Sequence, residues 1–439
     1  MKKAITYLLC FAAFLAPLRA SFLSIQISGF QLSPFRLVIL LTFVLHCLFN
    51  DHKNINVSRL TLPVVFLFFW LFYAIFSILW AKDYGSWFKN VFFLAFGAIE
   101  VLLYSKYFRR IDSIKNMTLF FCFGILIQAL IGWYEVFTKN YLFLEMDYGQ
   151  TLYYVDGTSR IPIAMHHNPN NYATLMFAGV CISFFQMSVS KKKIAKVFFA
   201  IALCQFIALL ILTQSRANIL ALIATSFLYL FFRYKKKFVF FTLTIIILLF
   251  AISYTRNYIL DRISGLFSSK DLGDSQSDLI RMNLIKNALY FVGRTFGMGV
   301  GAGQSEYWME NYPVFYTYSV TNIHNWWIEL LANYGLIIFF GYLFIYISVF
   351  LTFFKQRKDN NPKQKRMCLF LSCFLVGYII SCISPSSMMS IEWSWIFFSF
   401  LILYSNYVSV TKCSSNLKPF SKSLSLKNYE YISNCSLSK

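Results

Sequence analysis

Charged residues are scarce in this sequence, and acidic residues are the scarcer kind. The 439 residues include 18 Asp and Glu against 40 Lys and Arg, so that 13% are charged, whereas soluble domains have roughly 25%. Hydrophobic residues make up 58%, and apolar runs long enough to cross a bilayer recur throughout the chain. This composition excludes a soluble globular domain and predicts an integral membrane protein that crosses the bilayer many times.

Apolar runs and the breaks between them predict an all-α fold with about twelve transmembrane helices. The first run resembles a signal peptide but lacks a small-x-small cleavage pattern, so we interpret it as an uncleaved span. Residues 1–408 then form one integral membrane domain, and residues 409–439 form a disordered cytoplasmic tail. The spans are expected at about 4–18, 35–50, 61–80, 86–104, 114–137, 170–188, 193–213, 216–233, 237–254, 333–354, 366–385 and 389–408.

The positive charges predict the orientation of these spans, because short cytoplasmic loops are enriched in Lys and Arg. Alternate joints hold 27 of the 40 cations, which places both termini in the cytoplasm of a bacterial cell and the protein in the cytoplasmic membrane. The net charge of +22 is then concentrated on joints that face anionic membrane lipid. We therefore expect membrane lipid, and no nucleic acid, as a partner of these cations.

Two of the predicted outer loops are long, about 138–169 and 255–323, and the larger one lies between the ninth and tenth spans. It begins with a Ser/Asp/Gly-rich stretch, and a helix is expected over 278–291 with Ser277 or Asp278 as its cap. A glycine-rich turn region at 297–303 follows. The aromatic residues that crowd the approach to the next span indicate either interfacial anchoring or sugar stacking.

Four residues on the predicted outer face could carry chemistry. His324 precedes a short helix, a predicted break near 333–335 and a span; it is either an interfacial histidine or a base that accepts a proton. Arg216 stands at the turn of a helical hairpin, where it either snorkels or binds an anion through its planar fork. Arg281 in the large loop, and Arg160 in the earlier one, would by themselves be solvated surface residues.

Residues that would hold a metal are missing from the predicted outer face. None of the ten cysteines falls in an outer loop, and no Cys/His spacing indicates a metal site. His166 and His167 adjoin, but no third ligand stands at a suitable spacing. The first outer loop, about 19–34, lacks Asp and Glu, which metal-dependent polytopic glycosyltransferases need there. We expect no metal and no cofactor, so a pyrophosphate leaving group would require arginine or lysine.

Several short motifs together resemble those of the O-antigen ligase and polymerase superfamily. They are the His-Asn and Asn-Tyr-Gly of 322–341, the Ser-Arg of 213–224, the Asn-Pro-Asn of 168–170, the Gly-x-Gly-x-Gly of 299–303 and the SPFRLVILL of 33–41. Their order, their spacing and their side of the membrane all agree with that family.

The resemblance implies metal-independent, inverting glycosyl transfer on the outer face of the cytoplasmic membrane. The donor would be a glycan on a polyprenyl pyrophosphate, and the acceptor a second glycan. The family's loop histidine, which is thought to activate the acceptor hydroxyl, corresponds to His324. The arginines that are thought to hold the pyrophosphate correspond to Arg216 and Arg281, with Arg160 as a third candidate. A chain-length regulator is a candidate protein partner.

Three activities stay open at this point. A polymerase would join lipid-linked repeat units into an O-antigen or capsule, and we prefer this interpretation. A ligase would use the same site to move a finished glycan to its acceptor. A lipid-linked oligosaccharide flippase would also need about twelve spans, but it should show two similar halves and charges deep within its spans. Here the main charges within the predicted spans, Glu100 and Glu135, are near span ends, and the single large late loop breaks such a symmetry.

Overall fold

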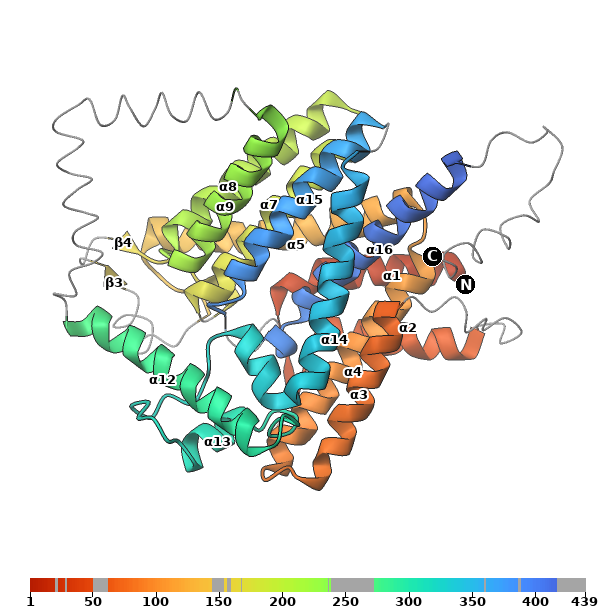
Figure 1. Ribbon diagram of the computed structural model, residues 1–439. Coiled ribbons are helices and arrows are strands. Elements are labelled where there is room, and N and C mark those ends of the chain that lie inside the picture. The colour runs from red at the N-terminus through yellow and green to blue at the C-terminus, as the bar shows by residue number, and fades with distance from the viewer. Residues whose placement is uncertain are drawn as a thin grey trace, which may run out of the picture.

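The computed structural model is a bundle of long α-helices with two short β-hairpins (Figure 1). The structure describes residues 1–19, 23–27, 30–49, 62–143, 154–155, 159–166, 168–235, 237, 272–358, 361–385 and 388–416. Its helices are α1 (Lys2–Leu15), α2 (Pro34–Phe49), α3 (Leu62–Phe76), α4 (Tyr84–Tyr107), α5 (Ile111–Thr138), α7 (Pro169–Val189), α8 (Lys193–Leu212), α9 (Arg216–Tyr234), α12 (Leu272–Arg294), α13 (Ser305–Asn311), α14 (Trp326–Gln356), α15 (Pro362–Ser381) and α16 (Glu392–Asn416).

The predicted spans agree with these helices wherever the structure describes them. Each predicted span except the ninth, 237–254, overlaps a helix, and all but the first residue of the ninth lies outside the described residues. Nine helices in the described part of the chain are long and apolar enough to cross a membrane. The protein is therefore a multi-pass membrane protein, and the count of twelve spans stays a prediction.

The bundle is built around α7, the helix with the largest buried share among the candidate spans. It packs against α5, α8 and α15, and α15 in turn packs against α9 and α14. Asn168 begins α7 by accepting a hydrogen bond from the Asn170 N–H at 2.8 Å, and Pro169 occupies the first helical turn, as the Asn-Pro-Asn sequence predicts. The start of α1 at the chain's beginning packs on α5 and α2.

Two helices of the large loop, α12 and the shorter α13, lie at one end of the bundle (Figure 1). Figure 1 places α12 and α13 beside the turn between α3 and α4. The Gln304 side-chain oxygen accepts hydrogen bonds from the backbone of Lys82 and Asp83, each at 2.8 Å, and so fixes the loop to that turn. We call this region the α12 end of the bundle.

Two predicted helix limits need correction. The loop helix runs over Leu272–Arg294 rather than 278–291, so Ser277 and Asp278 lie inside it and do not cap it. The expected start at 278 rests on the Ser/Asp/Gly-rich stretch before it, but acids are also favourable in the first turns of a helix, near its positive end. At the other end of the chain, α16 continues to Asn416, past the predicted boundary at 408, and residues 417–439 lie outside the described residues.

The two hairpins are small and antiparallel. β1 (Ile25–Ile27) pairs with β2 (Phe30–Leu32), and β3 (Tyr154–Val155) pairs with β4 (Ser159–Arg160).

Candidate functional site

A break in α14 organises the α12 end. Gly335 has φ 72° and ψ −171°, which interrupts the helix as the Asn-Tyr-Gly sequence predicts. The backbone groups released by this break bind the glycine-rich segment (297–303). The Val300 N–H donates to the Ala332 carbonyl at 2.8 Å, and the Gly301 N–H donates to the Asn333 carbonyl at 2.9 Å. The buried backbone at the break is thus satisfied by the loop rather than by the helix.

Glycine is required on both sides of this contact. A Cβ on Gly299 would lie 2.5 Å from the Gly335 nitrogen, and a Cβ on Gly335 would lie 2.2 Å from the Gly297 carbonyl oxygen. Both glycines also have positive φ, which residues with a Cβ rarely adopt. The glycine-rich region that the sequence indicated as a turn is therefore a close backbone contact between the large loop and α14.

A small apolar core holds α12 against the same part of α14. Leu284, Ala288 and Phe291 of α12 pack with Ile323 and Ala332, and all five are almost fully buried. Ile323 directly precedes His324 in the sequence, so this core fixes the segment that carries the histidine.

His324 stands at the entrance to α14. Its backbone is in the left-handed region, with φ 50°, and its N–H donates to the Asn322 side chain at 3.0 Å. The next residue, Asn325, caps α14 by accepting from the N–H groups of Trp327 and Ile328. An Asx turn and an N-cap thus place the imidazole on a defined backbone, and a non-glycine residue with positive φ is typical of functional positions.

Arg281 is the charged neighbour of His324. It projects from α12 and is exposed, and its positive charge acts on the histidine. Burial lowers the pKa of His324 from its ordinary value, and the charge of Arg281 lowers this pKa further. Two of the four predicted residues therefore interact electrostatically, and the lowered pKa favours the neutral, proton-accepting form of the histidine at physiological pH.

Arg216 is the first residue of α9, and a buried polar network fixes the helix start beside it. The Ser215 hydroxyl donates to the Asn170 side chain at 2.8 Å, and the Asn218 amide donates to the Ser215 hydroxyl at 3.0 Å. Asn218 is fully buried and accepts from the Ser381 hydroxyl at 2.5 Å. The Asn-Pro-Asn and Ser-Arg motifs therefore meet in space, together with the end of α15.

The end of α15 connects this network to the histidine segment. Ser381 binds Asn218, and the carbonyl of the next residue, Cys382, accepts from the Trp326 N–H at 3.0 Å. Trp326 follows His324 by two residues and is buried. A path of hydrogen bonds and backbone thus runs from the start of α9, through the end of α15, to the start of α14. Arg216 and His324 are anchored to the two ends of this path.

The fourth predicted residue, Arg160, is the last residue of β4, opposite Tyr154 of β3. Its side chain lies outside the part of the structure that is described. The same holds for His167, whereas His166 is buried at the end of a short 3₁₀ turn (Ala164–His166). No group of three His, Cys, Asp or Glu side chains suited to a metal ion occurs among the described residues.

The sequence interpretation missed a buried ion pair. Arg36 of α2 binds Glu392 of α16 at 2.8 Å, and each side chain is only 7% exposed. The Arg36 guanidinium also lies 5.0 Å from the ring centre of Phe93. Glu100 is buried as well, and it interacts electrostatically with both partners. The available signal was a charge in the first turn of each of two apolar helices, but nothing local shows that two residues 356 positions apart form a pair.

Residues 198–343 match the O-antigen ligase family model. This segment extends from α8 into α14 and contains Arg216, Arg281 and His324, so the resemblance noted from the short motifs is confirmed. The chain is also similar to the teichuronic acid biosynthesis protein TuaE of Bacillus subtilis (strain 168). The two are 28% identical over 420 residues, which cover 91% of this chain and 83% of that protein.

Proposed function

We propose that this protein polymerises polyprenyl-pyrophosphate-linked oligosaccharide repeat units into a surface polysaccharide on the outer face of the cytoplasmic membrane. The observation that carries the proposal is the electrostatic interaction of Arg281 with the half-buried His324 at the α12 end, within the segment that matches the O-antigen ligase family. The similarity to a teichuronic acid biosynthesis protein supports a surface polysaccharide as the product.

The proposed mechanism assigns one base and two or three cations. Neutral His324 accepts the proton of an acceptor sugar hydroxyl, and the resulting oxygen nucleophile attacks the anomeric carbon of the donor. The bond from that carbon to the pyrophosphate oxygen breaks on the opposite face, which inverts the configuration. Arg216 and Arg281, with Arg160 as the third candidate, match the charge of the departing polyprenyl pyrophosphate. These groups need neither a metal nor a cofactor.

The position of the site relative to the membrane is part of the proposal. Both termini lie in the cytoplasm, the α12 end lies outside, and the lipid tail of the donor lies between spans. Labelling of a cysteine introduced at Glu310, an exposed position of α13, tests this, with a membrane-impermeant reagent before and after lysis. Protection of that cysteine until lysis would contradict the mechanism, because the donor is presented on the outer face.

The function itself is tested by the surface glycan of a deletion strain. The strain is complemented with wild type, His324→Ala or Arg216→Ala, and the membrane level of each variant is matched by immunoblot. We expect a ladder of repeat lengths with wild type and single-repeat glycans with each variant.

Other outcomes would assign another activity. A full-length glycan that accumulates on its lipid carrier would identify a ligase, which uses the same groups to transfer a finished chain. Variants that complement fully would make His324 and Arg216 structural and would favour a flippase. A chain-length regulator, if it is a partner, would change the ladder's distribution without abolishing it.

A further inference from the structure

Three aromatic side chains on the loop after α13 stand outside the mechanism described above. Phe315, Tyr316 and Tyr318 are 38%, 68% and 43% exposed. The rings of Tyr316 and Tyr318 lie 4.5 Å apart between centres, tilted by 55°. We call these three residues the aromatic platform. Grouped, exposed rings on a protein surface indicate a binding function.

The backbone beneath the platform is fixed to α12. The buried side chain of Asn287 accepts hydrogen bonds from the Val314 and Phe315 N–H groups, at 2.9 and 2.8 Å, and donates to the Phe315 carbonyl at 2.7 Å. Asn283 donates to the Tyr316 carbonyl at 2.9 Å. Two asparagine side chains therefore hold the backbone that carries the rings, so the rings are exposed on a fixed segment of chain.

A strained turn displays the last ring. Tyr318 and Ser319 have φ of 52° and 63°, and the Val320 N–H closes the turn by donating to the Thr317 carbonyl at 3.0 Å. Residues with a Cβ are disfavoured in this left-handed conformation. The surrounding contacts thus hold a turn that presents Tyr318 to solvent next to Tyr316, although the local sequence does not favour it.

Short stretches of chain connect the platform to the proposed reaction centre. Asn283, which binds Tyr316, follows Arg281 by two residues on α12, and the chain that leaves the turn reaches His324 six residues after Tyr318. A glycan whose reacting sugar lies at His324 and Arg281 would bring its neighbouring sugars to these rings.

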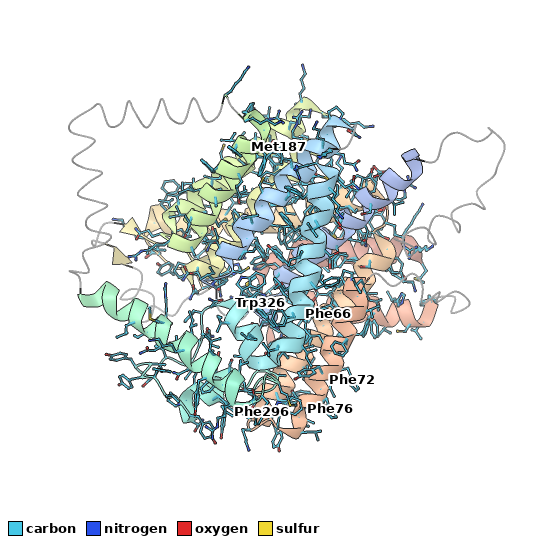
Figure 2. All side chains as sticks on the ribbon, in the orientation of Figure 1. Phe66, Phe72, Phe76, Met187, Phe296 and Trp326 are labelled. Atoms are coloured by element: carbon cyan, nitrogen blue, oxygen red, sulfur yellow. The ribbon has the colours of Figure 1, made fainter. Side chains whose placement is uncertain are left out.

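Other aromatic residues at the α12 end suit the membrane better. Phe296 is 97% exposed, and Figure 2 shows it toward Phe72 and Phe76, exposed residues of the candidate span α3. The hydroxyl of Tyr73 on α3 donates to the Met298 carbonyl at 2.6 Å. Met298 follows Phe296 by two residues, so this bond ties the segment that carries Phe296 to α3. That group is purely apolar, as a lipid contact requires. The platform instead carries two hydroxyls, which suit a ligand with a flat apolar face and hydrogen-bonding groups.

We propose that Phe315, Tyr316 and Tyr318 form a saccharide subsite that holds the sugar units next to the reacting sugar of the glycan. This proposal rests on the proposed function, since it concerns the same substrate. Tyrosine binds such a ligand at low conformational cost, because only two side-chain torsions need to be fixed. By holding the chain between transfers, the subsite would favour long products.

Binding without turnover tests the subsite. The full-length protein is purified in detergent as the His324→Ala variant, which prevents reaction. The probe is the strain's own surface polysaccharide, released from its carrier by mild acid and measured by titration calorimetry. Adding Tyr316→Ala and Tyr318→Ala should weaken binding roughly two- to tenfold for each ring lost. Phe296→Ala is the control, which removes a still more exposed ring just after the C-terminal end of α12, and Tyr316→Phe should retain most of the affinity.

A second measurement reads chain length in cells with an active histidine. Tyr316→Ala with Tyr318→Ala should shift the ladder to short chains while the first transfer continues. In the binding experiment, two results would overturn the proposed subsite and leave the polymerase proposal intact. One is an equal affinity with the native and the doubly substituted platform, and the other is an equal loss of affinity from Phe296→Ala. Failure of the proposed function would differ, since His324→Ala would then support a normal ladder.

Discussion

Arginine occupies two contrasting settings in this protein. Arg36 is buried, binds Glu392 at 2.8 Å and lies over the ring of Phe93. Arg281 is exposed at the α12 end, and its positive charge lowers the pKa of His324. In the first setting, the protein supplies the countercharge. In the second, no ion pair with the arginine occurs among the described side chains, and in the proposed function the ligand supplies the countercharge.

The two settings also differ in what holds them in place. The ion pair connects α2 and α16 by its own charges. The arginine and histidine of the α12 end would repel each other if both were charged, and they are held by other contacts: the apolar core of α12 and the glycine-mediated backbone contact with α14. A structural charge and a functional charge can thus be distinguished by what compensates each. The predictions below test this distinction.

The largest effect is expected at the histidine. His324→Ala removes the proposed base, so transfer in purified membranes should fall by about 10²- to 10⁴-fold, while the midpoint of thermal unfolding stays near that of wild type. Lipid-linked repeat units and a chromatographic assay of product length would measure this. If turnover and thermal stability fell together, His324 would belong with Arg36 as a structural residue.

The ion pair should show the opposite pattern. Arg36→Met leaves a buried Glu392 without its partner, which should destabilise the protein by about 3–5 kcal/mol. The double variant Arg36→Met with Glu392→Leu should recover most of that stability, because neither charge then needs a partner. Thermal unfolding in detergent, followed by the fluorescence of the native tryptophans, is the measurement. A double variant as unstable as the single one would show that the pair is not the source of the effect.

Sequence reasoning identified what depends on local pattern. Apolar length predicts the helices, Asn-Tyr-Gly predicts the break at Gly335, and a histidine before that break draws attention to His324. It could not pair Arg36 with Glu392, because opposite charges in separate helices have many possible partners until the helices are packed. Nor could it show that the glycine-rich segment contacts α14, since glycine permits a turn and a close approach equally.

The glycine contact should show an intermediate effect. Gly335→Ala places a Cβ against the Gly297 carbonyl oxygen in a positive-φ position, so we expect destabilisation by roughly 1–3 kcal/mol. Gly293→Ala is the matched control on α12. Nothing lies within 4 Å of its Cβ position, and alanine there should be neutral or stabilise the helix by up to about 1 kcal/mol. Limited proteolysis of the loop should increase for Gly335→Ala alone. Equal resistance of both variants would show that the backbone contact does not hold the α12 end.

The smallest effect concerns the pH dependence of transfer. In the proposed mechanism neutral His324 is the active form, so activity should fall as the pH drops through its lowered pKa. The charge of Arg281 is one cause of that lowering, so Arg281→Gln should raise the pKa and move the acid limb of the activity profile to higher pH. The shift should stay below about one pH unit, because an exposed charge is screened.

Lys286→Gln is the control, since that exposed cation of α12 lies 5.4 Å from the ring of Phe315 and does not contribute to the lowered pKa of the histidine. Each profile is normalised to its own maximum, which separates the shift from the loss of a pyrophosphate-binding cation. An acid limb that does not move, or that moves to lower pH, would mean that Arg281 does not act on the catalytic base. The contrast with Arg36 would then rest on ligand binding alone.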